Sequence, residues 1–121
     1  MNYASKAYTK TAKEIAAPRE LEASLLLQAA AKLQAVRDSW KDKPEGLSDA
    51  LVYNRRLWTV FLDSLIKDDG RLPAPLHENL KTLGAFVMCE TFSLMTKPKL
   101  KHLESLIKIN CRIAAGLGGR H

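Results

Sequence analysis

The sequence predicts an all-α protein, an antiparallel bundle of four main helices with a shorter helix at the N-terminus. Between a few breaks the chain consists mostly of strong helix formers such as Ala, Leu, Lys, Glu and Gln. No stretch alternates strictly between apolar and polar residues before a hairpin turn, so no sheet is expected. The breaks that separate five helical segments are Pro18, Lys41 to Gly46, Asp68 to Pro75, and Pro98.

The first segment, expected to be helical from about residue 3 to 16, has the thinnest apolar face. Tyr8 and Ile15 are its only large apolar residues at helical spacing, and it carries three lysines. An isolated helix of this length is marginally stable in water, so it must dock on the rest of the molecule or on a partner, or remain mobile. We therefore expect residues 1–121 to form a single helical domain in which 1–16 is a weakly docked helix or arm.

The second and third segments show the strongest helical periodicity. The second is expected at 19 to 40, with Pro18 in a first-turn position and apolar residues recurring every three or four positions. The third is expected at 48 to 67, with Ser48 as a plausible N-cap and Trp58 on its apolar face. Its broad apolar face predicts that it is the central helix.

The last two segments are expected at 75 to 96 and 99 to 116. Gly84 in the fourth segment predicts a close helix crossing, and glycines after residue 115 end the fifth. Short connections between amphipathic helices of similar length favour antiparallel neighbours. The residues expected in the core are Leu25, Leu33, Leu51, Trp58, Phe61, Leu62, Leu80, Leu83, Val87, Leu103, Ile107 and Ile113.

Length and composition exclude several classes of protein. A chain of 121 residues buries roughly two-thirds of its extended-chain surface on folding, enough for one core and too little for a second domain. The longest apolar run, Leu83 to Cys89, has seven residues, far short of the ~20 that cross a bilayer. No apolar stretch follows the N-terminal residues, so no secretory signal is expected and the cytoplasm is the default location.

The residues give no sign of catalytic or metal chemistry. Three histidines lie far apart, without cysteine or carboxylate at metal-ligand spacing, and no nucleophile elbow or glycine-rich phosphate loop is present. The Glu-x-x-His pairs of di-iron bundles are also missing. We therefore expect no enzyme activity, no cofactor and no metal site. Cys89 and Cys111 are interpreted as small buried apolar residues.

Positive charge is concentrated near the C-terminus. Residues 97–121 hold six basic residues against Glu104 alone, a local charge of +5 within a net charge of +6. This stretch has no aromatic residue for stacking on bases, so a solvated helix face is favoured over an RNA-binding patch. The residues that would contact RNA in the second case are Lys97, Lys99, Lys101, Lys108 and Arg112.

Two asparagines lie within apolar helix faces. Asn54 shares a face with Leu51 and Trp58, and Asn110 shares one with Leu103 and Ile107. An unpaired buried amide costs on the order of 1–3 kcal/mol, so each is predicted to be buried and hydrogen-bonded to main chain or to the other asparagine. A contact with a partner is the alternative. Arg55 and Arg56 are expected at the rim of the apolar face, with Arg56 pointing furthest from it.

Several segments together resemble the FlaF family of flagellar biosynthesis regulators of alphaproteobacteria. The resemblance covers nearly the whole chain, and its most specific part is the Tyr-Asn-Arg-x-Leu-Trp block at 53–58. The segments that carry it are Pro18 to Ala23 with the Leu and Ala run that follows, Ala50 to Thr59, Asn79 to Phe86, Leu106 to Asn110, and Ile113 to Leu117.

Membership of that family implies a protein that promotes flagellin synthesis or export after transcription. The implied partners are flagellin and an FlbT-like regulator, which restrains flagellin translation. Two mechanisms remain open: an export chaperone whose groove holds an amphipathic flagellin helix, which we favour, or action on flagellin mRNA, directly or through an FlbT-like RNA-binding partner. A membrane-surface role ranks last. The partner-binding candidates are Arg19, Tyr53, Asn54, Arg55, Arg56, Trp58 and Asn110.

Overall fold

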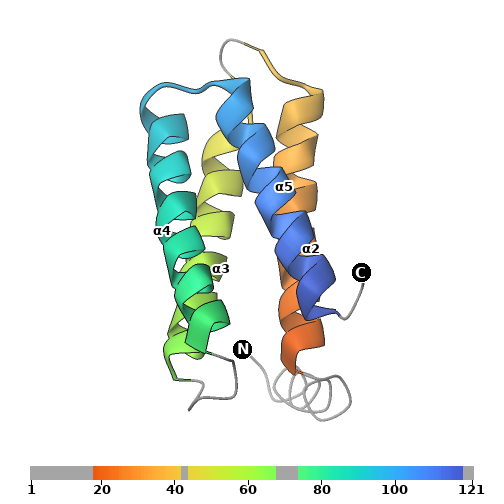
Figure 1. Cartoon of the computed structure of the whole chain (residues 1–121). Coiled ribbons are helices and arrows are strands. Elements are labelled where there is room, and N and C mark those ends of the chain that lie inside the picture. Colours follow the sequence, from red (N-terminus) through yellow and green to blue (C-terminus); the bar gives the residue numbers. More distant parts are fainter. Residues whose placement is uncertain (1–17, 42–43, 68–73, 119–121) are drawn as a thin grey trace, which may run out of the picture.

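Four helices form the part of the chain that the computed structural model describes, which is residues 18–41, 44–67 and 74–118. They are α2 (Pro18–Asp38), α3 (Leu47–Ile66), α4 (Ala74–Thr96) and α5 (Leu100–Leu117). Successive helices run in opposite directions, so the bundle has an up-and-down arrangement (Figure 1). No strand occurs in these ranges, which confirms the all-α prediction. The helix expected at 3 to 16 lies outside the described residues.

The helices pack as a closed ring in which each one contacts the two on either side. α2 packs against α3 and α5, and α4 packs against the same two helices. The contact between α2 and α5 is the most extensive. Small residues permit it: Ala23 and Ala30 of α2 and Ala114 of α5 are buried, so the two backbones approach closely.

Most of the predicted core is confirmed, with four residues less buried than expected. Leu25, Leu62, Leu83 and Ile113 are half-buried. Three of these, Leu62, Leu83 and Ile113, pack against the edge of the core, whereas Leu25 lies at the outer junction of α2 and α3. The predicted core residues that are buried are Leu33, Leu51, Trp58, Phe61, Leu80, Val87, Leu103 and Ile107.

Two local predictions change and one holds. Ser48 is not the N-cap of α3, because the helix begins at Leu47 after Gly46, which has a φ of 78° and whose carbonyl accepts a hydrogen bond from the Ala50 N–H. Cys89 is exposed rather than buried. The close crossing predicted at Gly84 is present: a Cβ on this residue would lie 2.6 Å from both δ carbons of Leu62 in α3.

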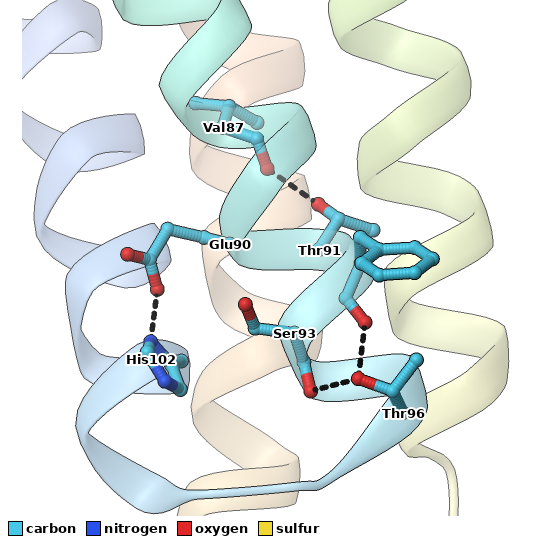
Figure 2. A network of polar contacts seen from close by, with 7 residues as sticks. Val87, Glu90, Thr91, Ser93, Thr96 and His102 are labelled. Carbon is cyan, nitrogen blue, oxygen red and sulfur yellow. Dashed lines mark hydrogen bonds and ion pairs between the residues drawn. The ribbon is translucent and has the colours of Figure 1, made fainter.

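Polar contacts hold the last turn of α4, and one of the pairs drawn in Figure 2 joins α4 to the start of α5. The Thr96 hydroxyl donates to the carbonyls of Phe92 and Ser93, at 3.1 and 3.2 Å, in the last turn of α4. After the turn, His102 of α5 pairs with Glu90 of α4, and both side chains are mostly buried. This pair holds the first turn of α5 against α4.

Candidate partner-binding groove

Three polar side chains from α3 and α5 meet in the centre of the bundle. Asn54, Trp58 and Asn110 are each 0% exposed. The indole Nε1–H of Trp58 donates to Asn110 Oδ1 at 2.9 Å, and Asn110 Nδ2 donates to Asn54 Oδ1 at 2.7 Å. Asn110 Nδ2 also lies 3.4 Å from the Leu26 carbonyl of α2. The predicted burial and mutual hydrogen bonding of the two asparagines are confirmed.

This buried cluster fixes how three helices are rotated relative to one another. Turning α3 or α5 about its axis would separate Asn110 from Trp58 and Asn54 and leave polar atoms unpaired in the core. Asn54 Nδ2 has no hydrogen-bond partner among the described residues. Of the predicted partner-binding candidates, Asn54, Trp58 and Asn110 are thus inside the bundle, where they position the surfaces that α3 carries.

The other half of the 53–58 block faces outward, because consecutive helix positions are about 100° apart. Tyr53 is half-buried, and Arg55 and Arg56 are exposed. The Tyr53 hydroxyl lies 3.4 Å from Gln28 Oε1 of α2, and the Lys32 ammonium lies 4.9 Å from the centre of the Tyr53 ring. Tyr53 therefore bridges the outer edges of α2 and α3.

An open, mostly apolar groove runs beside Tyr53 along the junction of α2 and α3. Its volume is about 520 Å³. Leu25 and Leu57 are half-buried in it, and Val60 is 67% exposed. We call this surface the α2–α3 groove; its lining residues are Leu25, Asp49, Val52, Tyr53, Arg56, Leu57 and Val60.

The charges of the α2–α3 groove lie at two levels of α3. Asp49 is near the start of the helix and Arg56 is two turns later. Arg55 and Arg56 are both exposed, in agreement with their expected place at the rim of the apolar face of α3, and Arg56 lines the groove. No local pattern in the sequence marks the groove, and one of its lining residues, Leu25, is predicted to lie in the core.

The remaining candidates lie elsewhere on the molecule. Arg19, in the first turn of α2, forms an ion pair with Glu22. All five basic residues proposed as RNA contacts are exposed. Lys97 and Lys99 lie in the connection before α5, whereas Lys101, Lys108 and Arg112 share one face of α5 because they are seven and four residues apart.

The described residues contain no group of three or more histidine, cysteine, aspartate or glutamate side chains placed to hold a metal ion. None of the four helices combines the length and apolar character that crossing a membrane requires. Cys111 is half-buried against the core, in partial agreement with its expected burial.

Comparison with known proteins gives one match. The sequence model of a family described as "Flagellar protein FlaF" matches residues 4–117, nearly the whole chain. No curated protein and no solved structure shows significant similarity to this chain.

Proposed function

This chain belongs to the FlaF family of flagellar proteins, and we propose that it promotes flagellin synthesis or export by binding flagellin as an export chaperone or adaptor. The proposal places it in the cytoplasm, where flagellin is found before export. It requires a surface that holds another chain and no chemistry of its own. The observation that carries it is the α2–α3 groove.

The groove has the character of a site for an amphipathic helix. Such a helix binds by inserting apolar side chains at positions i, i+3, i+4 and i+7 into an apolar groove between two helices. Val52, Leu57 and Val60 supply apolar surface along α3, and Leu25 supplies it from α2. The length of groove between Val52 and Val60 corresponds to about two helical turns, which fits such a set of anchors.

The charged residues of the groove give it a direction. Asp49 and Arg56 are of opposite sign and lie about two turns apart along α3. A partner helix is favoured when its basic residues lie near Asp49 and its acidic residues lie near Arg56. We therefore propose that these two side chains set the orientation of the bound flagellin helix, while the apolar residues supply most of the affinity.

A second candidate function is supported by the exposed basic residues. Lys101, Lys108 and Arg112 form a row on α5, and Lys97 and Lys99 extend positive charge beyond its start. Such a row contacts phosphates without reading sequence. In this alternative the protein acts on flagellin mRNA, directly or with an FlbT-like RNA-binding partner.

Binding measurements at two salt concentrations separate the two functions. Purified protein is titrated into labelled flagellin and, separately, into labelled flagellin leader RNA, at low and at physiological salt. We expect flagellin binding to persist at physiological salt and RNA binding to weaken steeply, because contacts with phosphates release counterions.

The matched control is the double variant Lys108→Glu/Arg112→Glu, which changes only exposed residues. It should leave flagellin binding unchanged. RNA binding that is tight at physiological salt and lost in this variant, without binding to flagellin, would replace the chaperone proposal with the RNA alternative.

A further inference from the structure

The outward face of α4 exposes two aromatic side chains to solvent. α4 is rich in apolar residues on nearly every side, which is typical of a helix that is covered all round. Phe86 is 45% exposed and Phe92 is 68% exposed, and Cys89 between them is exposed as well. We call this surface the α4 strip; its residues, at helical spacing, are Thr82, Ala85, Phe86, Cys89, Phe92, Ser93 and Thr96.

No charge lies on the α4 strip. Glu90 is the only charged residue between Lys81 and Lys97. Its carboxylate pairs with His102 of α5, so it is turned to the side of α4 and away from the strip (Figure 2). An uncharged surface of this length is unusual on a chain whose net charge is +6.

The strip is symmetric in sequence about Cys89. Thr82 and Thr96 lie seven residues on either side of it, Ala85 and Ser93 lie four, and Phe86 and Phe92 lie three. When two copies of a helix pair antiparallel about a twofold axis, residue i of one faces residue j of the other and the sum of i and j is constant. With the axis at Cys89, each phenylalanine faces a phenylalanine and each threonine faces a threonine.

We propose that the partner of the α4 strip is a second copy of this chain, paired antiparallel about a twofold axis at Cys89. Charge favours this copy-to-copy contact. Two chains of charge +6 repel each other where basic surfaces meet, and the strip is where they can approach without opposing like charges.

The proposed dimer and the proposed flagellin site use different residues. The α4 strip is formed by α4 alone, whereas the groove is lined by residues of α2 and α3. The dimer would therefore leave both grooves open and present two of them on one particle. Binding two segments of one partner would then raise the apparent affinity without a new contact.

The first test measures the mass of the protein in solution over a range of concentrations, for example by sedimentation equilibrium. Phe92→Asp and Val60→Asp are a matched pair, because Phe92 is 68% exposed on the strip and Val60 is 67% exposed in the groove. We expect the wild type and Val60→Asp to approach twice 13.5 kDa as concentration rises, and Phe92→Asp to stay at 13.5 kDa.

The predicted effect on the dimer is at least about a tenfold rise in its dissociation constant in Phe92→Asp, since a carboxylate would be placed against an apolar ring. A wild type that remains a monomer throughout, or a dimer that persists in Phe92→Asp, contradicts the proposal. Both variants should keep the far-ultraviolet circular dichroism of the wild type, because neither changes a buried residue.

The second test locates the axis by disulfide formation. Two Cys89 thiols at a twofold axis face one another, and diamide oxidises them to a disulfide by accepting their two hydrogens. Cys111→Ser retains Cys89 and should give a covalent dimer on a non-reducing gel, whereas Cys89→Ser retains Cys111 and should not. Crosslinking through Cys111 alone contradicts the proposed axis.

These tests separate the dimer from the flagellin site. Phe92→Asp should lose the dimer and keep binding to a single flagellin segment, whereas Val60→Asp should keep the dimer and lose flagellin binding. A Phe92→Asp monomer that also loses that binding assigns flagellin to the strip, which would contradict both this inference and the groove.

Discussion

The helices α3 and α4 place polar and apolar residues in opposite ways. α3 brings Asn54 and the indole N–H of Trp58 into the core, where both are hydrogen-bonded to Asn110. α4 leaves two phenylalanines on its outer face in contact with solvent. A buried polar residue costs free energy unless its partners are positioned, and an exposed aromatic row adds nothing to folding. The buried polar residues of α3 therefore indicate a role in fixing the fold, and the exposed phenylalanines of α4 indicate a binding surface.

The contact between α3 and α4 at Gly84 depends on close packing and, in the part of the chain that the structure describes, involves no hydrogen bond from Gly84 to a side chain of α3. Gly84 of α4 lies against Leu62 of α3 with no room for a side chain. α4 is therefore positioned by close packing and by the Glu90–His102 pair, whereas α3 is positioned by directional hydrogen bonds. The difference predicts that substitutions in the buried cluster affect the free energy of unfolding most and that those on the α4 strip affect it least.

Trp58 and Phe92 should show the largest difference between the two helices. Trp58→Ala should lower the free energy of unfolding by about 4 kcal/mol, because it leaves a cavity and unpairs Asn110 Oδ1. Phe92→Ala should change it by less than about 0.5 kcal/mol, since the ring is largely exposed. Urea unfolding followed by circular dichroism measures both, at a concentration low enough for the protein to be a monomer.

If Trp58→Ala does not fold, Trp58→Phe provides the same comparison with a smaller cavity. It should still cost about 2 kcal/mol, chiefly through the lost hydrogen bond to Asn110. Equal stability losses at positions 58 and 92 would show that the proposed contrast between the two helices is wrong.

The two asparagines should differ from one another by the number of groups that each one leaves unpaired. Asn110→Leu leaves the Trp58 N–H and Asn54 Oδ1 without hydrogen-bond partners, so it should lower the free energy of unfolding by about 2–4 kcal/mol. Asn54→Leu removes the hydrogen bond from Asn110 Nδ2, but it also removes the Asn54 amide nitrogen, which has no partner among the described residues. The two effects partly cancel, so the free energy of unfolding should fall by about 1 kcal/mol or less. The same urea titrations test this, and a larger loss for Asn54→Leu would contradict the hydrogen-bond assignment.

A small effect, between those of the buried cluster and of the α4 strip, is expected at the α3–α4 crossing. Gly84→Ala gains helix propensity but forces Leu62 to move, since the new Cβ would lie 3.1 Å from its Cγ and closer to its δ carbons. We expect a net loss of about 1 kcal/mol. In a Leu62→Ala background the clash disappears, so the same substitution should become neutral or stabilising.

Much of the fold was predictable from the sequence because breaks and periodicity are local signals. The four described helices lie within two residues of the predicted bounds, and the asparagines were found because each interrupts an apolar face. Leu25 is predicted to lie in the core because a groove between two helices is lined by the same residue types as a core. Cys89 is predicted to be buried because free cysteines usually are, and periodicity cannot show that it faces outward, since α4 is apolar on nearly every side.

The candidate site was only partly predictable for the same physical reason. The block at 53–58 was identified, but only three-dimensional packing separates Asn54 and Trp58, which are buried, from Arg55 and Arg56, which are exposed. Val60 completes the groove although nothing in its sequence position distinguishes it from a core valine. The groove depends on how far apart α2 and α3 lie, which no local pattern records.

The central claim, that the α2–α3 groove holds flagellin, is tested most directly by the dissociation constant for flagellin of three proteins: the wild type, Val60→Asp and Thr59→Asp. Thr59 is exposed and adjacent to Val60, yet it does not line the groove. The account predicts that Val60→Asp raises the dissociation constant at least about tenfold and that Thr59→Asp changes it by less than about twofold. Equal affinities for all three proteins, or a loss confined to Thr59→Asp, would contradict it.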